Sequence, residues 1–169
     1  LGGAATVASS PTTGTIGWGR WYRSTPSGTI WPHPIGDGVF DYVVGMPTAS
    51  MPTSGTATYS LMGYTNPVVN DGSILTSGGS VSGTFAANFA SGAVTLNMTV
   101  TNALSDTYAL NGPLSNNISG PNFSGTLNGS GGGCATNCTT SISGFFAGSN
   151  AVNAGLTYKI SDSGNSNVT

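Results

Sequence analysis

Charged side chains are what this sequence has least of. Only 5% of its 169 residues are charged, there is no glutamate, and the formal net charge is −2. An average globular domain carries roughly 25% charged residues. A chain this neutral, without a basic patch, has little with which to attract a phosphate backbone or an anionic bilayer. We therefore expect no nucleic-acid partner and no binding to an anionic membrane surface.

Side chains that transfer protons are equally scarce. The chain has one histidine, one lysine and five aspartates. A carboxylate pair for glycoside hydrolysis would have to be Asp37 and Asp41, or aspartates that meet only in the fold. Asp37 lies in Ile-Gly-Asp-Gly, a context typical of turns. The sequence has no Gly-x-Ser-x-Gly elbow, phosphate loop or calcium loop. We expect a protein without enzymatic activity.

Helix formers and long apolar runs are missing as well. The abundance of glycine argues against a helical protein. No apolar stretch reaches the roughly 20 residues of a membrane-spanning helix, so we expect no membrane span. There is no signal peptide, and the chain begins at Leu1, as a mature or trimmed chain would. A membrane barrel is the alternative, but glycine and alanine dilute the apolar band that such a barrel needs.

Cysteine occurs only twice, as Cys134 and Cys138 in GGGCATNCTT. A metal or redox pair is one interpretation of this spacing, but a structural zinc site needs four ligands and the chain has a single histidine. The other interpretation is a disulfide that closes a short turn. We favour the disulfide, which implies an oxidising compartment.

What the sequence does have is alternation. In residues 94–100, Val, Leu, Met and Val alternate with Thr, Asn and Thr, the pattern of a strand with one buried face. Similar runs recur about every 8–12 residues between turn signals, which is typical of a meander, sandwich or barrel. The strands that we expect are 15–23, 38–45, 55–63, 80–90, 92–102, 104–111, 121–129, 139–148 and 153–161.

The short connections between these runs favour an all-β fold, a single antiparallel up-and-down β-barrel of about eight strands. The length of the chain favours one domain, residues 1–169. We expect residues 1–14 to form an N-terminal strand or arm and residues 15–161 to form the body of the barrel.

Two stretches resemble a known family. They are YVVGMPTASMPTSGTATYSLMG at 42–63 and SISGFFAGSNAVNAGLTYKI at 141–160. Their pattern of Pro-Thr-x-Gly-x-x-x-Tyr, then Gly-Phe-Phe-x-Gly, then Ala-Gly-Leu-x-Tyr is similar to that of the transferrin-binding-protein-B-like β-barrel domain. That domain occurs in Gram-negative surface lipoproteins and at the C-terminal end of some proteins with a FecR-type regulatory domain. The resemblance covers most of residues 38–161, and it implies an eight-stranded antiparallel barrel without enzymatic activity.

The sequence departs from the family at its C-terminal end. Family barrels usually have one more strand after the segment that matches 162–168, but this chain stops at Thr169. A barrel without its last strand exposes two edges and a groove. We expect residues 2–8 to close their own barrel or to enter a neighbour's groove and build a fibre; a chain that continues past Thr169 is the alternative. The contact residues of this strand would be Gly3, Ala5 and Val7.

Aromatic residues and arginines gather near the N-terminus. On the strand predicted at 15–23, Trp18, Arg20 and Tyr22 share one face and Trp21 and Arg23 share the other, so large side chains lie on both faces. Trp, Tyr and Arg dominate interface hot spots, so a contact surface is one interpretation and an internal plug is the other. The residues that we expect at a contact surface are Trp18, Arg20, Trp21, Tyr22, Arg23 and Trp31.

His33 lies in a Trp-Pro-His-Pro motif. It is a candidate axial ligand of haem, with Trp31, Tyr42 and Phe40 as an apolar wall; a loop histidine with a local hydrogen bond is the alternative. The flanking prolines forbid the helix that would align His33 with Asp37 and Asp41 as metal ligands. We expect no metal and, apart from haem, no cofactor.

Two functions follow from these observations. The first is a structural, self-assembling subunit, a fibre or surface coat, whose partner is another copy of the chain. Low charge favours such packing because it lowers the repulsion between subunits. The second is a binding module for iron or haem acquisition, or for another surface ligand, whose partner is a surface protein or small molecule. Either function places the chain outside a Gram-negative cell or on its outer surface.

Overall fold

The structure is a computed structural model that describes residues 8–9, 16–22, 39–70, 75–132, 134, 138–161 and 167–168. The regular elements among them are strands, apart from one short 3-10 turn at Ser149–Ala151. The strands are β1 (Ala8–Ser9), β2 (Ile16–Tyr22), β3 (Val39–Gly45), β4 (Thr56–Ser60), β5 (Val68–Asn70), β6 (Leu75–Ser77), β7 (Gly79–Asn88), β8 (Ala93–Asn102), β9 (Thr107–Pro113), β10 (Asn122–Gly131), β11 (Cys138–Ala147), β12 (Asn153–Ser161) and β13 (Asn167–Val168).

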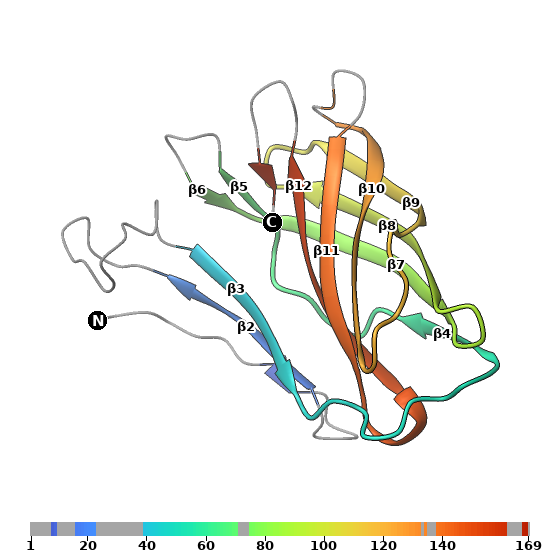
Figure 1. The fold of residues 1–169 in the computed structure, drawn as a ribbon. Coiled ribbons are helices and arrows are strands. Elements are labelled where there is room, and N and C mark those ends of the chain that lie inside the picture. The colour runs from blue at the N-terminus through green and yellow to red at the C-terminus, as the bar shows by residue number, and fades with distance from the viewer. Residues whose placement is uncertain are drawn as a thin grey trace, which may run out of the picture.

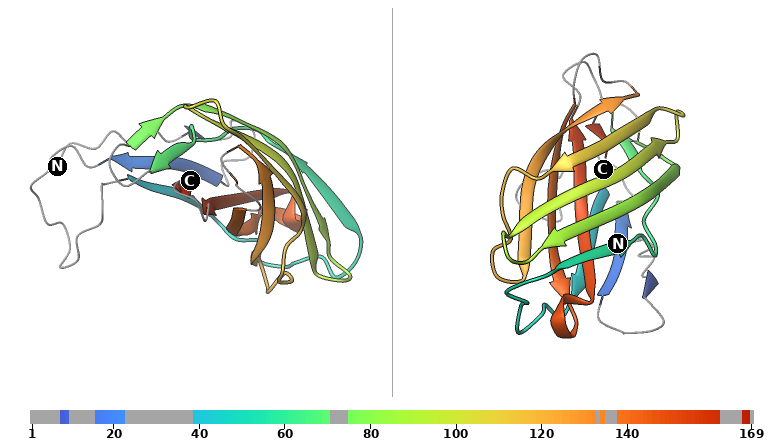
Figure 2. Two further views of the ribbon diagram at one scale, coloured as in Figure 1. Left: turned by 90° about the horizontal axis from the view of Figure 1, so that it is seen from above. Right: turned by 90° about the vertical axis from the view of Figure 1, so that its right-hand side faces the viewer.

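Ten of these strands form one antiparallel sheet, in the order β4-β7-β8-β9-β10-β11-β12-β13-β5-β6 (Figure 1). Strands β7 to β12 follow each other in sequence and in space, which makes them an up-and-down meander. Seen from above, the sheet curls into an arc with an open side (Figure 2). The predicted all-β, antiparallel, barrel-like fold is confirmed, and the barrel is open rather than fully closed.

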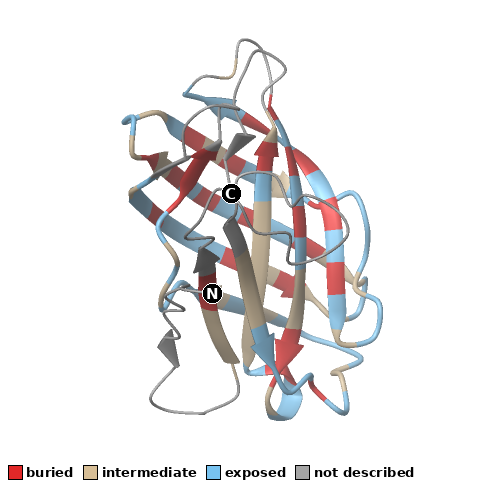
Figure 3. Ribbon diagram, turned by 90° about the vertical axis from the view of Figure 1, so that its left-hand side faces the viewer, coloured by how far each residue is buried: buried red, intermediate tan, exposed pale blue. Residues whose placement is uncertain are grey.

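The alternating pattern of the sequence becomes the two faces of the curled sheet. On β8, Val94, Leu96, Met98 and Val100 are buried, whereas the intervening polar residues are exposed. Figure 3 shows the same alternation of buried and exposed residues along the other long strands. Because successive side chains of a strand point to opposite faces, each run places its apolar set inside the curl and its hydroxyl and amide groups in water.

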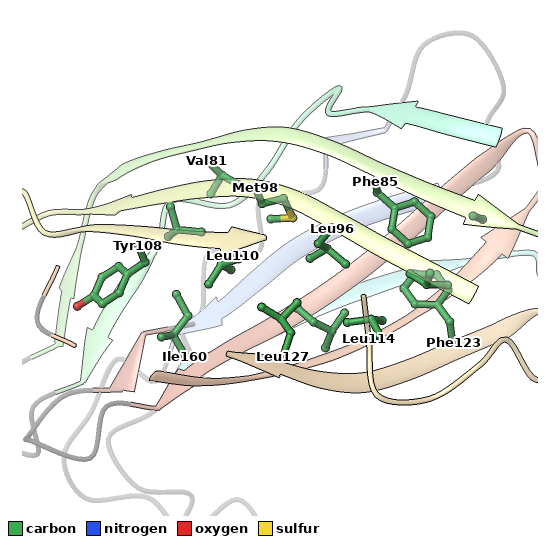
Figure 4. Packing of buried hydrophobic residues seen from close by; sticks show 14 of the residues in the cluster. Val81, Phe85, Leu96, Met98, Tyr108, Leu110, Leu114, Phe123, Leu127 and Ile160 are labelled. Carbon is green, nitrogen blue, oxygen red and sulfur yellow. The ribbon is translucent and has the colours of Figure 1, made fainter. Parts of the chain in front are cut away.

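The core inside the curl has an aromatic end and an aliphatic middle (Figure 4). The ring of Phe85 stacks on that of Phe123 with centroids 4.9 Å apart, and Phe146 lies 5.1 Å from Phe123. Aromatic pairs at such distances contribute about 0.5–1.5 kcal/mol beyond the area that they bury. Leu96, Leu110 and Ile160 fill the middle, and none of them is more than 1% exposed.

One predicted strand is displaced along the chain. The expected strand at 104–111 is β9, Thr107–Pro113, because residues 103–106 form a turn instead. The side-chain oxygen of Asn102 accepts hydrogen bonds from the backbone N–H groups of Leu104 and Asp106, both 2.9 Å long. A buried asparagine that satisfies its neighbours' backbone in this way holds a turn and competes with a strand.

Three short strands were not predicted: β5, β6 and β13. Strand β13 lies between β12 and β5, with Val168 opposite Ile160 on one side and Val69 on the other. The sequence was expected to leave the edge of β12 open, and β13 covers this edge at Ile160 and Ser161. Strand β13 thus depends on segments far apart in sequence, whereas β5 and β6 pair with each other as a short hairpin.

A second, three-stranded sheet is built from β1, β2 and β3. Strands β2 and β3 pair antiparallel over their whole length, from Ile16 opposite Gly45 to Tyr22 opposite Val39. Ala8 of β1 pairs with Trp18 of β2. The described end of the predicted 2–8 strand thus joins β2 rather than the edge of β12, and residues 1–7, including Gly3, Ala5 and Val7, lie outside the described residues.

Candidate binding pocket

The open side of the barrel lies between β4 and β12. Strand β12 pairs with β11 along its whole length, but on its other side β13 reaches only Ile160 and Ser161. Strand β4 pairs with β7 alone, and residues 61–67 lead from it to β5. The described part of β12 from Asn153 to Lys159 is therefore hydrogen-bonded to one strand, and the ladder of the barrel wall is interrupted there.

The β2–β3 hairpin lies beside this interruption, next to β12 (Figure 1). Glycine at position 155 lets it approach: a Cβ atom there would lie only 2.5 Å from Cγ2 of Val43 and 3.3 Å from Cγ2 of Ile16. Trp18 packs in the same way on Gly63 of the 61–67 connection. The hairpin thus covers the opening by contacts at two glycines, one on each side.

A cavity of about 400 Å³ remains between the hairpin and the barrel, within the roughly 300–1,000 Å³ of small-molecule pockets. We call it the hairpin pocket. It is lined by three groups of residues: Trp18, Tyr42 and Val43 from the hairpin; Leu61, Met62 and Tyr64 from the connection; Ala154, Leu156 and Tyr158 from β12. Phe85 of β7 and Met98 of β8 reach it from the core.

An ion pair joins the two strands of the hairpin, and the same arginine ties the hairpin to β6. Nε and Nη2 of Arg20 donate to the two carboxylate oxygens of Asp41, each over 2.8 Å, and Nη1 donates to Oγ of Ser77 on β6 over 3.1 Å. Arg20 is only 3% exposed, whereas the side chain of Asp41 is 17% exposed. A two-pronged pair of this kind fixes both position and orientation. The pair therefore orients the guanidinium of Arg20 between the hairpin strands, and its third nitrogen bonds the hairpin to β6.

Tyr158 stands out in the lining because its hydroxyl oxygen is buried and has no hydrogen-bond partner among the described residues. Burial raises the pKa of Tyr158 above its usual range; Asp41 raises it further, Arg20 opposes this, and Tyr64 adds a smaller rise. The hydroxyl therefore stays protonated at neutral pH. Tyr59 differs, because its hydroxyl donates to the carbonyl oxygen of Ala151 over 2.6 Å.

Large apolar side chains stand exposed at the mouth of the pocket. Leu61 is 43% exposed, Met62 68%, Tyr64 42% and Val152 57%. Single exposed apolar residues are ordinary, but a group beside a concave apolar cavity marks an interaction site. Sequence reasoning missed this group, and the apolar run Leu-Met-Gly-Tyr at 61–64, interrupting a polar stretch, was the signal that could have found it.

The predicted contact residues fall into three groups. Trp18 is half-buried and lines the pocket. Arg20 was expected at an outward contact surface, but its guanidinium lies inside the protein, because it is bound to Asp41 and Ser77. Trp21 and Tyr22 belong to β2, and their side chains are not among those described. Arg23, Trp31 and the candidate haem ligand His33 lie outside the described residues.

The disulfide is confirmed. Cys134 and Cys138 are joined, with their Cα atoms 5.3 Å apart. The pair closes the β10–β11 turn, so these thiols are not available to a metal. In the described parts of the chain no three side chains of His, Cys, Asp or Glu gather into a metal site, and no helix is long and apolar enough to cross a membrane.

Comparisons with known proteins bear on the fold. No family model and no curated protein matches the sequence. A solved structure of a double mutant of the vaccine antigen transferrin binding protein B, from Haemophilus parasuis, is similar over 98% of this chain, with a TM-score of 0.59 and 18% sequence identity. This chain spans 35% of the length of that one. The chain therefore has the fold of a transferrin-binding-protein-B-like β-barrel, as its two sequence motifs predicted.

Proposed function

We propose that this chain is a non-catalytic binding module on the outer surface of a Gram-negative bacterium. The observation that carries the proposal is the hairpin pocket, a concave and largely apolar cavity at the open side of the barrel. Pockets of this size and lining are the usual small-molecule sites of proteins. Among the described residues of the lining the one that carries a charge is Asp41, whose carboxylate is held by Arg20, so these residues provide no nucleophile with an adjacent base.

The surface location rests on two further observations. The fold resembles that of transferrin binding protein B, which is named as a vaccine antigen. The disulfide between Cys134 and Cys138 suits an oxidising compartment. Both agree with a chain whose polar surface consists mainly of hydroxyl and amide groups.

The single lysine of the chain provides a test of location. Lys159 is exposed on β12, so an amine-reactive biotin reagent that does not cross membranes should label it on intact cells. Peptide mass spectrometry at Lys159 reads the label, Lys159→Arg is the matched control, and a cytoplasmic protein in the same cells reports leakage. Labelling of Lys159 only after lysis would show that the chain is not on the surface.

A finer version of the proposal is a role in iron or haem acquisition. The name of the similar structure says that that protein binds transferrin, and His33 is the one histidine here. Haemin added to the purified chain should give a Soret band that is lost in His33→Ala. Without a spectral change at micromolar protein, haem is excluded, and transferrin can then be tested by pull-down against the same preparation.

A structural subunit is the second candidate function. The observation in its favour is the strand edge of β12 from Asn153 to Lys159, which among the described residues is hydrogen-bonded to β11 alone, although the β2–β3 hairpin packs beside it. An added strand from another copy would complete the sheet. Native material should then form filaments or ordered sheets by negative-stain electron microscopy, and deletion of residues 1–8 should abolish them. Polymers that survive the deletion would refute strand exchange through this segment.

A further inference from the structure

We propose that the hairpin pocket binds one uncharged, unbranched aliphatic chain, lying along β12 beneath the β2–β3 hairpin. This deepens the proposed binding function and rests on it. The argument uses the shape of the cavity, the charge of its lining and the exposed residues at its mouth.

The lining of the pocket extends along β12. It follows β12 without a break from Val152 to Tyr158, which at about 3.3 Å per residue is a length of about 20 Å. On the opposite side the lining runs from Thr58 to Thr65. The cavity of about 400 Å³ lies between these two sides. An extended ligand can contact both of them over this length.

The two sides of this groove are connected at one of its ends. The hydroxyl of Tyr59, on β4, donates to the carbonyl oxygen of Ala151, which lies just before β12. Residues 61–65 and β12 then continue from this point on either side of the hairpin, whose Trp18 packs on Gly63 and whose Val43 packs on Gly155. The groove is thus bounded along its length by backbone and apolar side chains, which suits a straight apolar chain.

The charge of the lining excludes ionic recognition of the ligand. Among the described residues that line the pocket, Asp41 is the one that carries a charge, and both of its oxygens accept hydrogen bonds from Arg20. A charged head group would leave water without gaining an opposite charge, which is costly. Apolar burial, at about 0.8 kcal/mol for each methylene group, is therefore the force that remains, so affinity should depend on chain length.

The exposed residues at the mouth show how such a chain enters. Met62 and Val152 present most of their apolar surface to solvent on the two sides of the groove. Leu61 and Tyr64 stand next to Met62 on the same connection and are also exposed. A bound aliphatic chain would cover these side chains. Their exposure to solvent is not explained by packing within the barrel, but it is explained by a ligand that contacts them.

The experiment uses hexadecanol as the probe and the full chain as the protein. Native mass spectrometry should show one hexadecanol for each chain, and isothermal titration should show octanol binding at least a hundredfold more weakly. Leu156→Trp fills the groove from β12 and should weaken hexadecanol binding at least tenfold. The matched control is Leu104→Trp, in the exposed β8–β9 turn outside the pocket, which should bind hexadecanol as the original chain does.

A second variant guards against misfolding of Leu156→Trp. Met62→Ser changes a side chain that is already 68% exposed, so the fold should be retained while hexadecanol binding weakens. The proposal is overturned by no binding of hexadecanol, by equal binding in Leu156→Trp and Leu104→Trp, or by equal affinity for octanol. Hexadecanoate that binds more than tenfold tighter than hexadecanol would also overturn it, and so would a dimer that fills the groove in place of the alcohol.

The hexadecanol-binding experiment and the surface labelling of Lys159 test the two proposals independently. Surface labelling without hexadecanol binding would retain the surface module and reject the aliphatic ligand. Hexadecanol binding without surface labelling would retain the ligand and reject the location.

Discussion

The hydroxyl of Tyr59 donates a hydrogen bond of 2.6 Å to the carbonyl oxygen of Ala151. The two residues lie 92 positions apart, on opposite sides of the opening in the barrel wall. Their bond joins the end strand β4 to the turn that precedes β12, where no backbone ladder connects the two. The barrel is therefore held together across its opening by side chains rather than by strand pairing.

Tyr59→Phe should lower the free energy of unfolding by about 1–2 kcal/mol, because it removes this bond and leaves the Ala151 carbonyl without its donor. The aromatic ring is retained, so its packing on Phe85 at 5.2 Å should persist. Urea denaturation followed by circular dichroism gives the value. A change below a few tenths of a kcal/mol would mean that the bond contributes nothing to closing the barrel.

Tyr158→Phe should have the opposite effect on the free energy of unfolding. Its hydroxyl is buried without a hydrogen-bond partner among the described residues, and an unsatisfied buried polar group costs about 1–3 kcal/mol. Removal of the oxygen should therefore raise the free energy of unfolding by about 1 kcal/mol, measured by the same denaturation. Tyr59→Phe serves as the matched control, since it is the same substitution at a bonded hydroxyl. Equal losses in both variants would contradict this account.

The two tyrosines also predict how stability responds to alkali. Burial raises the pKa of Tyr59 from 10.0 to about 12, and burial, with help from Asp41, raises that of Tyr158 further. A raised tyrosine pKa means that the folded state favours the neutral hydroxyl. This stabilisation is complete below pH 10 and is lost as the pH rises from 10 through about 12.

The measurement is the free energy of unfolding between pH 9 and pH 12, where each such tyrosine adds a slope of at most about 1.4 kcal/mol per pH unit. The double variant Tyr59→Phe/Tyr158→Phe should show a visibly flatter profile over this range. If its profile has the same slope as that of the original chain, other groups cause the alkaline loss.

The alternation of the long strands was predictable because one physical cause fixes both sequence and structure there. A strand with one buried face must carry apolar residues at every second position, as Val94 and Leu96 do, so β7 to β12 could be located from the sequence. Strand β13 could not, because it exists through long-range pairings such as Val168 with Val69, and β5 and β6 are three residues each, too short to show an alternating pattern.

The candidate site was less predictable than the fold. The sequence placed Trp18 and Arg20 on one face of a strand, which is correct, but it could not show what that face covers. The partner of Arg20 lies 21 residues away on the next strand, and the register of β2 against β3 decides that Asp41 stands opposite. The pocket also needs residues 61–64, which join it only once β4 and β12 have come together.

The ion pair between Arg20 and Asp41 should behave as a buried pair. Arg20→Met or Asp41→Asn alone should lower the free energy of unfolding by about 3 kcal/mol, because each leaves a desolvated charge without its partner. This loss of free energy is at the lower end of the range for broken buried ion pairs, because the side chain of Asp41 is 17% exposed. Arg20→Met/Asp41→Leu should recover at least half of this loss, as replaced buried pairs commonly do. Additive losses in a double-mutant cycle would show that the pair is not coupled.

Gly63→Ala tests whether the hairpin is seated on the connection. Gly63 is not in the left-handed region, so alanine adds no backbone strain, but its Cβ would overlap the indole of Trp18. We expect a loss of about 1–3 kcal/mol from overpacking and a red shift of tryptophan emission as Trp18 moves towards water. In the Trp18→Ala background the same substitution meets no indole, and its cost should fall below about 0.5 kcal/mol. An equal cost in both backgrounds would place the effect of Gly63 elsewhere, and the hairpin would then not be held by this contact.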